Sequence, residues 1–183
     1  MKIALDMEGV LADSHRVVDQ LLLEECGIKF NHDTQATRWS AWELIGIPER
    51  AYLILGGRAW LERDVGVYDS FSGGIVEALR HVGHEVDILT ARGAPRIADI
   101  KREWLKEHVA GSPKLVEPPR GVSKGKMPYD LLIDDGLHNI VSQVGEGKRA
   151  IIYDRVWNRG CMALELTKRY RSLADLQFEG WLR

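Results

Sequence analysis

The sequence lacks long apolar runs and any strong imbalance of charge. None of its hydrophobic stretches approaches the ~20 residues that a membrane-spanning helix requires. Acidic and basic side chains nearly balance, with a formal net charge of −2 at pH 7. That charge provides no electrostatic basis for wrapping a nucleic-acid polymer or for attachment to a membrane surface. We therefore expect neither a nucleic-acid polymer nor a membrane as a partner.

Cysteine is also scarce. Cys26 and Cys161 have neither the spacing of a metal site nor the density of a disulfide scaffold. The first residues do not form a secretory signal, because Asp6 interrupts the apolar segment early. These features predict free thiols and a cytoplasmic protein. A chain of 183 residues, 45% hydrophobic and 28% charged, is typical of a globular fold and long enough for one domain or for a core with a modest insertion.

Short buried strands alternate with amphipathic helices along most of the chain. Five segments are predicted as strands, because each is short, apolar and bounded by glycine, proline or charge: 2–5, 84–91, 113–117, 130–134 and 149–154. Helices are predicted over 72–83 and 94–109, where apolar residues recur on one face. This alternation indicates an α/β fold, a three-layer Rossmann-like arrangement around a five-stranded parallel sheet.

Residues 14–68 interrupt the alternation. They follow the first strand, contain no convincing strand of their own and are predicted to be helical over 16–27, 37–46 and 49–64. Such a block predicts a small helical cap inserted after the first strand, with Gly56-Gly57 and Gly73-Gly74 as candidate joints. We therefore expect a catalytic core formed by 1–13 and 69–183, and a cap formed by 14–68.

Polar residues follow the predicted strands at the edge where ligands bind in open α/β sheets. They comprise two acids after the first strand, a hydroxyl after the second, an acid pair after the fourth and a lysine pair just upstream of it: Asp6, Glu8, Thr90, Asp134, Asp135, Lys124 and Lys126. Carboxylates are ligands that Mg²⁺ prefers, whereas a hydroxyl and an ammonium suit phosphate oxygens. The set fits phosphoryl transfer to an aspartate.

Four segments carry a resemblance to a known superfamily. DMEGVLAD (6–13), ILTAR (88–92), LLIDD (131–135) and a lysine ten residues before the first acid of LLIDD resemble the four motifs of the haloacid dehalogenase superfamily. Closer still is the likeness to the 5′(3′)-deoxyribonucleotidase family. That likeness extends to AIIYDRVWNRG (150–160) and RYRSLADL (169–176), so it runs from the first strand to the end of the chain.

The resemblance implies a role for each acid at a matching position. Asp6 would be the nucleophile that accepts the phosphoryl group and would also bind Mg²⁺. Residue 8 would give its main-chain carbonyl to the metal and use its side chain as the general acid/base. Asp134 would complete the metal site, with Asp135 as a direct or indirect partner.

The remaining motif residues would contact the substrate. Thr90 would hydrogen-bond the phosphate, with Ala91 and Arg92 beside it, and Lys124 would hold Asp6 ionised. Spacing alone favours Lys124 over Lys126, and either could be an ordinary solvated loop lysine. Thr90 alone could be a β-branched strand residue, and Arg92 an exposed arginine at a strand end.

Two further features keep structural alternatives. Trp39 and Trp42, in the predicted cap, are candidates for stacking on a nucleobase, although tryptophans at such positions also form hydrophobic cores. Asn158 either pins the loop after the fifth strand or caps a helix. Taken alone, the acid pairs could belong to turns or caps.

Glu8 departs from the family pattern, which normally has aspartate at this position. A contact between the metal and its main chain would survive, but the extra methylene displaces the carboxyl by ~1 Å, and a displacement of that order can cost ~100-fold in rate. Glu8 therefore predicts either slow catalysis or a site adapted to a different leaving group.

The function expected from these features is Mg²⁺-dependent hydrolysis of a small phosphomonoester through an aspartyl-phosphate. A (deoxy)nucleoside monophosphate is the expected substrate, as for a 5′-nucleotidase. The alternative is a phosphate- or nucleotide-binding protein with little turnover, which Glu8 motivates. Carbon–halogen hydrolysis is disfavoured, because the acid pair at 134–135 would repel the nucleophile without a cation between them. The oligomeric state is left open, with a homodimer as one alternative.

Overall fold

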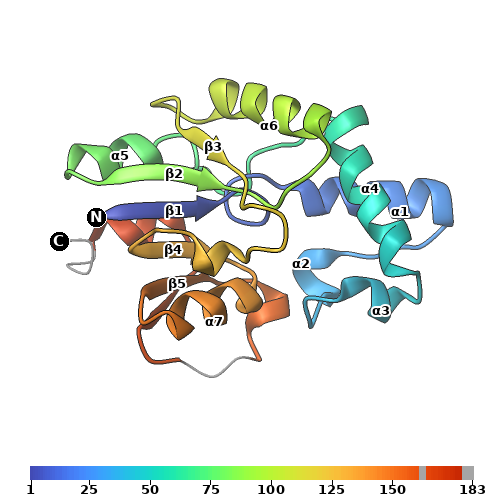
Figure 1. Ribbon diagram of the computed structural model, residues 1–183. Helices are drawn as coiled ribbons and strands as arrows, with labels where there is room; N and C mark the ends of the chain where they lie inside the picture. Colours follow the sequence, from blue (N-terminus) through green and yellow to red (C-terminus); the bar gives the residue numbers. More distant parts are fainter. Residues whose placement is uncertain (161–163, 179–183) are drawn as a thin grey trace.

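The computed structural model describes residues 1–160 and 164–178, which form a parallel six-stranded sheet flanked by helices (Figure 1). The sheet has the strand order β3-β2-β1-β4-β5-β6, and every neighbouring pair is parallel. The strands are β1 (Lys2–Asp6), β2 (Glu85–Leu89), β3 (Lys114–Val116), β4 (Leu131–Asp134), β5 (Arg149–Tyr153) and β6 (Thr167–Tyr170). The predicted α/β Rossmann-like class is therefore confirmed.

The predicted number of strands, five, is wrong by one, because β6 adds to the edge beside β5. β6 pairs in parallel with β5, with Ile152 opposite Arg169. Its sequence, TKRY, is only half-buried and lacks the apolar character of the inner strands. Edge strands commonly carry charge, which discourages pairing with another chain. Because of the same charged residues, such strands lack the apolar pattern by which the other strands are predicted from the sequence.

The inner strands are buried because helices cover the sheet. Ile3 and Leu5 of β1 and Leu131 and Ile133 of β4 have no exposed surface. The helices of this part of the chain are α5 (Ile75–His81), α6 (Pro95–His108) and α7 (Leu137–Gly145), together with the 3-10 helices η1 (Lys124–Lys126), η2 (Val156–Asn158) and η3 (Leu173–Phe178). α5 and α6 lie within the predicted helical segments. α7, which packs on β4 and β5, has no counterpart among them.

Four helices lie between β1 and β2 in the sequence. They are α1 (Ser14–Cys26), α2 (His32–Gln35), α3 (Ala41–Ile45) and α4 (Glu49–Glu62). In Figure 1, α2, α3 and α4 gather at the end of the sheet toward which the strands point. The predicted joint at Gly56-Gly57 is wrong, because both residues lie inside α4. The division into a core and a cap at 14–68 stays a prediction.

The packing of η1 on α7 leaves no room for a side chain at position 125. A Cβ on Gly125 would lie 2.3 Å from the backbone nitrogen of Gln143 and 2.5 Å from the carbonyl oxygen of Asn139. A Cβ on Gly145, at the end of α7, would have no such neighbouring atom within 4 Å. Gly125 therefore allows the loop that carries Lys124 to approach the helix closely.

Gly125→Ala should destabilise the protein, because the backbone of α7 cannot yield cheaply. We expect a loss of about 2 kcal/mol, or roughly 4–8 °C in Tm, measured by thermal unfolding. Gly145→Ala is the matched control and should leave Tm unchanged or slightly higher, since alanine favours a helix. A Gly125→Ala protein that melts with the wild type would contradict the close contact.

No helix within residues 1–160 and 164–178 combines the length and apolar character needed to cross a membrane. Cys26 is exposed and is not in a disulfide, whereas Cys161 lies outside the described residues.

Candidate active site

The sheet brings together acids that are far apart in the sequence. β1 and β4 are neighbours, with Leu5 opposite Ile133, so Asp6 and Asp134 emerge side by side at the carboxyl edge. Asp135 follows directly. One oxygen atom from each of the three carboxylates lies within 4.8 Å of the others, and all three residues are buried.

Neighbouring donors fix two of these carboxylates. Asp134 accepts hydrogen bonds from the backbone N–H of Gly136 at 2.7 Å and from the Asn139 side chain at 3.1 and 3.3 Å. Asp135 accepts one from Trp157 Nε1 at 3.1 Å. Within the described part of the chain, Asp135 Oδ1 is buried and has no hydrogen-bond partner. An unpaired buried carboxylate oxygen beside two further carboxylates fits a hard divalent cation such as Mg²⁺.

The crowding of these acids changes their protonation. Burial, followed by the charge of Asp134, raises the pKa of Asp6 well above its ordinary value, against the opposing effect of Lys124. Burial and Asp134 also raise the pKa of Asp135, to about 7. A cation bound among these carboxylates would oppose both shifts, because it stabilises their ionised forms.

Lys124 brings a positive charge into this cluster. Its Nζ lies 2.5 Å from Asp6 Oδ1 and 3.5 Å from Asp134 Oδ2, and the side chain is buried. Burial would lower its pKa, but Asp134, Asp6 and Glu8 raise it overall, so Lys124 is protonated at neutral pH. Lys126, the alternative left open by the sequence, is exposed at the other end of η1.

Glu8 lies beside the acid cluster but is held by other partners. Its Oε2 accepts a hydrogen bond from Thr90 Oγ1 at 2.8 Å, and its Oε1 forms an ion pair with Lys101. Burial would raise the pKa of Glu8, but Lys101 and Lys124 together with these hydrogen bonds lower it to about 2. Glu8 is therefore a carboxylate at neutral pH.

Gly9 allows the loop that carries Glu8 to pass close to the acid pair Asp134-Asp135. It has a φ of +74°, and a Cβ on it would lie 2.3 Å from Asp135 Oδ2. Arg155 holds the same loop, because its Nε donates to the Gly9 carbonyl at 2.8 Å. A residue with a side chain at position 9 would clash with the acid cluster.

The segment after β5 holds Asp135 from the other side. Asn158 donates to the carbonyl oxygens of Asp135 and Tyr153 at 2.9 and 2.8 Å, and its own Oδ1 accepts from the backbone N–H of Arg155 at 3.1 Å. The Asn158 side chain has both of the roles considered for it. It pins the loop after β5, and it bonds to the N-cap backbone of η2.

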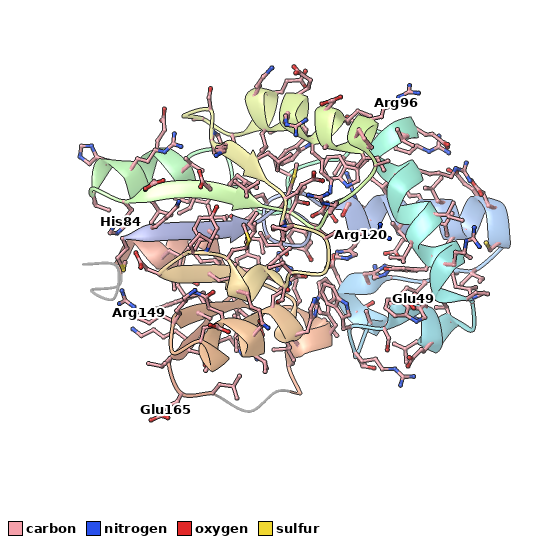
Figure 2. All side chains as sticks on the ribbon, in the orientation of Figure 1. Glu49, His84, Arg96, Arg120, Arg149 and Glu165 are labelled. Atoms are coloured by element: carbon pink, nitrogen blue, oxygen red, sulfur yellow. The ribbon has the colours of Figure 1, made fainter. Side chains whose placement is uncertain are left out.

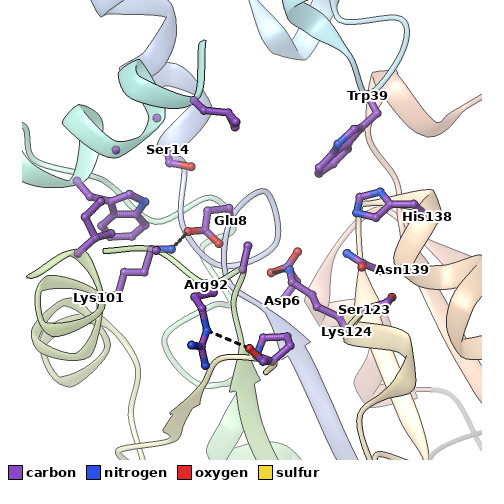
Figure 3. Close-up of a pocket in the computed structure, with 18 of the residues that line it drawn as sticks. Asp6, Glu8, Ser14, Trp39, Arg92, Lys101, Ser123, Lys124, His138 and Asn139 are labelled. Carbon is purple, nitrogen blue, oxygen red and sulfur yellow. Dashed lines mark hydrogen bonds and ion pairs between the residues drawn. The ribbon is translucent and has the colours of Figure 1, made fainter. Parts of the chain in front are cut away.

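A cavity of about 970 Å³ opens onto Asp6, Glu8 and Lys124 between the sheet and the helical block (Figure 3). Such a volume suits a small organic ligand. Much of the wall is apolar or aromatic and comes from the segment between β1 and β2, with Trp39 in the loop before α3 and the other residues in α1 and α4: Val18, Trp39, Tyr52, Leu53, Gly56, Gly57 and Trp60. In Figure 2, Arg120 of the wall lies beside this block, whereas His84 and Arg149 mark the opposite end of the strands.

Some of the residues expected to bind the substrate line the cavity, whereas Trp42 and Thr90 do not. Ala91 and Arg92 line the cavity, and Arg92 Nε donates to the Pro118 carbonyl at 3.3 Å. Trp39 lines it as well, with its ring 5.0 Å from that of His138. Trp42 instead packs on Tyr52, outside the wall. Thr90 has no exposed surface, so its contact with a phosphate stays a prediction.

Sequence reasoning missed several residues that hold this site, among them Asn139, Trp157 and Lys101. Asn139 and Trp157 hold Asp134 and Asp135, and no local pattern distinguishes them from other polar or aromatic residues. Lys101 had a visible signal. It is a lysine on the apolar face of α6, in helical register with Ile97 and Trp104, and it is only 5% exposed.

Comparisons with known proteins connect this arrangement to solved structures. No protein-family model matches the chain, and no match is found among curated proteins. A haloacid dehalogenase-like hydrolase from Bacteroides fragilis aligns with a TM-score of 0.61 at 14% identity, over 96% of this chain and 98% of that one. CbbY from Rhodobacter sphaeroides in complex with phosphate aligns with a TM-score of 0.59 at 11% identity, over 96% and 95%.

A CbbY variant in complex with xylulose-(1,5)bisphosphate gives a TM-score of 0.59 at 12% identity, over 96% of this chain and 95% of that one. At such low sequence identities the structural similarity shows the fold alone. The narrower resemblance to the nucleotidases stays a prediction. The chain thus has the fold of the haloacid dehalogenase-like hydrolases, with its acids gathered at the carboxyl edge of the sheet.

Proposed function

We propose that this protein is a Mg²⁺-dependent phosphomonoester hydrolase in which Asp6 is the nucleophile. The observation that carries the proposal is the position of Asp6. Its carboxylate lines the cavity, Lys124 lies 2.5 Å from it, and two further carboxylates adjoin it. A nucleophile in a cavity, beside an ammonium and two further carboxylates that could hold a metal ion, suits the transfer of an anionic phosphoryl group.

In the proposed reaction, an Asp6 oxygen attacks phosphorus and the bond to the leaving oxygen breaks. Water then attacks the aspartyl-phosphate and releases inorganic phosphate. Lys124 favours the ionised form of Asp6, as the bound cation would also do, and balances the charge of the phosphate. The leaving oxygen takes its proton from solvent water. Glu8, which is a carboxylate at neutral pH, is the base that accepts a proton from the attacking water.

Asp6, Asp134 and Asp135, with the Glu8 main-chain carbonyl, would hold the Mg²⁺ ion. The ion would neutralise the repulsion between an anionic nucleophile and an anionic substrate. Lys124 pairs with Asp6 and lies 3.5 Å from Asp134, so its ammonium already compensates these carboxylates before a phosphate binds.

The proposed substrate is a (deoxy)nucleoside monophosphate. The support comes from the apolar part of the cavity wall, where Trp39 offers an aromatic ring and Val18, Leu53 and Trp60 offer apolar surface. Such a wall suits a flat, weakly polar group attached to a phosphate. A sugar phosphate is the natural comparison, because it presents polar hydroxyls to the same surface.

The test is phosphate release from a panel of nucleoside monophosphates, sugar phosphates and 4-nitrophenyl phosphate. We expect release with Mg²⁺, none above background after chelation with EDTA, and the highest kcat/KM for a nucleoside monophosphate. Restoring Mg²⁺ should restore the rate. A wild-type protein that releases phosphate from no member of the panel would refute the proposed function, whereas preference for a sugar phosphate would refute only the substrate.

A further inference from the structure

Lys101 connects three parts of the molecule that meet at the cavity. It comes from α6, yet its side chain is buried and reaches the cavity wall (Figure 3). Its Nζ pairs with Glu8 Oε1, donates to Thr90 Oγ1 at 2.9 Å and lies 5.4 Å from the centre of the Trp60 ring of α4. A buried lysine is costly unless its charge is compensated, so these contacts need an explanation.

The contacts fix both oxygens of Glu8. Lys101 holds Oε1, and the Thr90 hydroxyl donates to Oε2 while accepting from Lys101. The three side chains thus form a closed triangle of interactions in which each group has a defined donor or acceptor role. Trp60 covers the ammonium from the helical block, where a cation over an aromatic face is favourable.

We propose that Lys101 is the positioning residue for Glu8 and that the two act as a matched pair. The inference rests on the proposed function, in which Glu8 transfers protons. Lys101 does not touch the reacting atoms of that scheme. It holds the longer glutamate side chain in one place, so that its carboxylate stays beside Asp6 instead of moving through the cavity.

The matched pair accounts for glutamate at this position. An aspartate would end one methylene short of Lys101 and would leave a buried ammonium without its carboxylate. The loss of one member of a buried ion pair is much more damaging than the loss of an exposed one. Glu8 and Lys101 should therefore be energetically coupled, whereas independent sites give additive effects.

The test is a double-mutant cycle measured with 4-nitrophenyl phosphate and Mg²⁺. Lys101→Met should lower kcat by about 10²-fold with KM changed by less than about threefold, because misplacement of a catalytic group by ~1 Å costs that much. In a Glu8→Gln background, the same Lys101→Met change should cost less than about twofold, since no carboxylate remains to be positioned. Lys101→Arg, which keeps the charge, should recover at least about tenfold over Lys101→Met.

Two measurements separate positioning from a general effect on folding. Lys106→Met, on the exposed side of the same helix, is the matched control and should keep the wild-type kcat and Tm. A crystal structure of Lys101→Met should show the Glu8 carboxylate displaced from Thr90, whether or not the protein turns over any phosphomonoester.

Three outcomes would overturn the inference. They are a wild-type kcat in Lys101→Met, an equal loss in the wild-type and Glu8→Gln backgrounds, and an unmoved Glu8 in the crystal structure. Failure of the proposed function is a different result, in which the wild type itself releases no phosphate from any compound tested.

Discussion

Asp6→Asn should release phosphate at least roughly 10⁴-fold more slowly than the wild type, the scale expected when a covalent nucleophile is removed. Asparagine preserves the shape of the side chain and can still accept the hydrogen bond from the Met7 backbone N–H, at 2.6 Å in the wild type. It removes the negative charge that attacks phosphorus. The measurement is phosphate release at saturating substrate with Mg²⁺.

The same substitution should not unfold the protein. Burial, Asp134 and Asp135 all oppose ionisation of Asp6, so a neutral amide relieves repulsion within the acid cluster. Without Mg²⁺, Asp6→Asn should therefore melt at the wild-type Tm or above it. A lower Tm together with low activity would mean that the loss reports on folding.

Asp130→Asn is the matched control. Asp130 is exposed just before β4, at the opposite end of the sheet from the cavity, where it accepts a hydrogen bond from the Lys2 backbone N–H at 2.7 Å. This variant should keep the wild-type rate. An Asp6→Asn protein that retained more than about a tenth of the wild-type rate would rule out an aspartyl-phosphate at this residue.

Glu8→Gln should lower kcat by about 10²–10⁴-fold, the contribution usual for general acid/base catalysis. Glutamine has nearly the same shape, and its amide oxygen can still accept from either Thr90 or Lys101. It cannot take a proton from water. If water attack is the step that slows, the phosphoryl group should stay on Asp6, and mass spectrometry of the denatured protein should detect it.

Glu8→Asp should also lose activity, by about 10²-fold, because its carboxyl is displaced by ~1 Å and no longer reaches Lys101. This variant distinguishes the two functions considered for the chain. A loss shows that the site is adapted to glutamate. A large gain would favour the alternative, a phosphate-binding protein with little turnover, since aspartate would then restore a catalytic group that the native protein lacks.

The local sequence determined most of the fold and part of the candidate site. β1 and β4 are continuous apolar segments, and such segments belong to buried parallel strands. Because parallel strands point the same way, acids that follow them meet at one edge, and Asp6 and Asp134 do so. β6 escaped prediction, since an edge strand is half-exposed and needs no apolar pattern.

Only the tertiary structure decided which side chains face the cavity. Lys124 and Lys126 are the same residue type two positions apart, but the turn of η1 buries Lys124 against Asp6 and exposes Lys126. Trp39 and Trp42 differ in the same way, one on the cavity wall and the other against Tyr52. Lys101 lies 93 residues after Glu8 in the sequence, and the two pair because the fold brings α6 beside the loop that follows β1. Periodicity describes one element at a time, whereas these choices depend on contacts between elements.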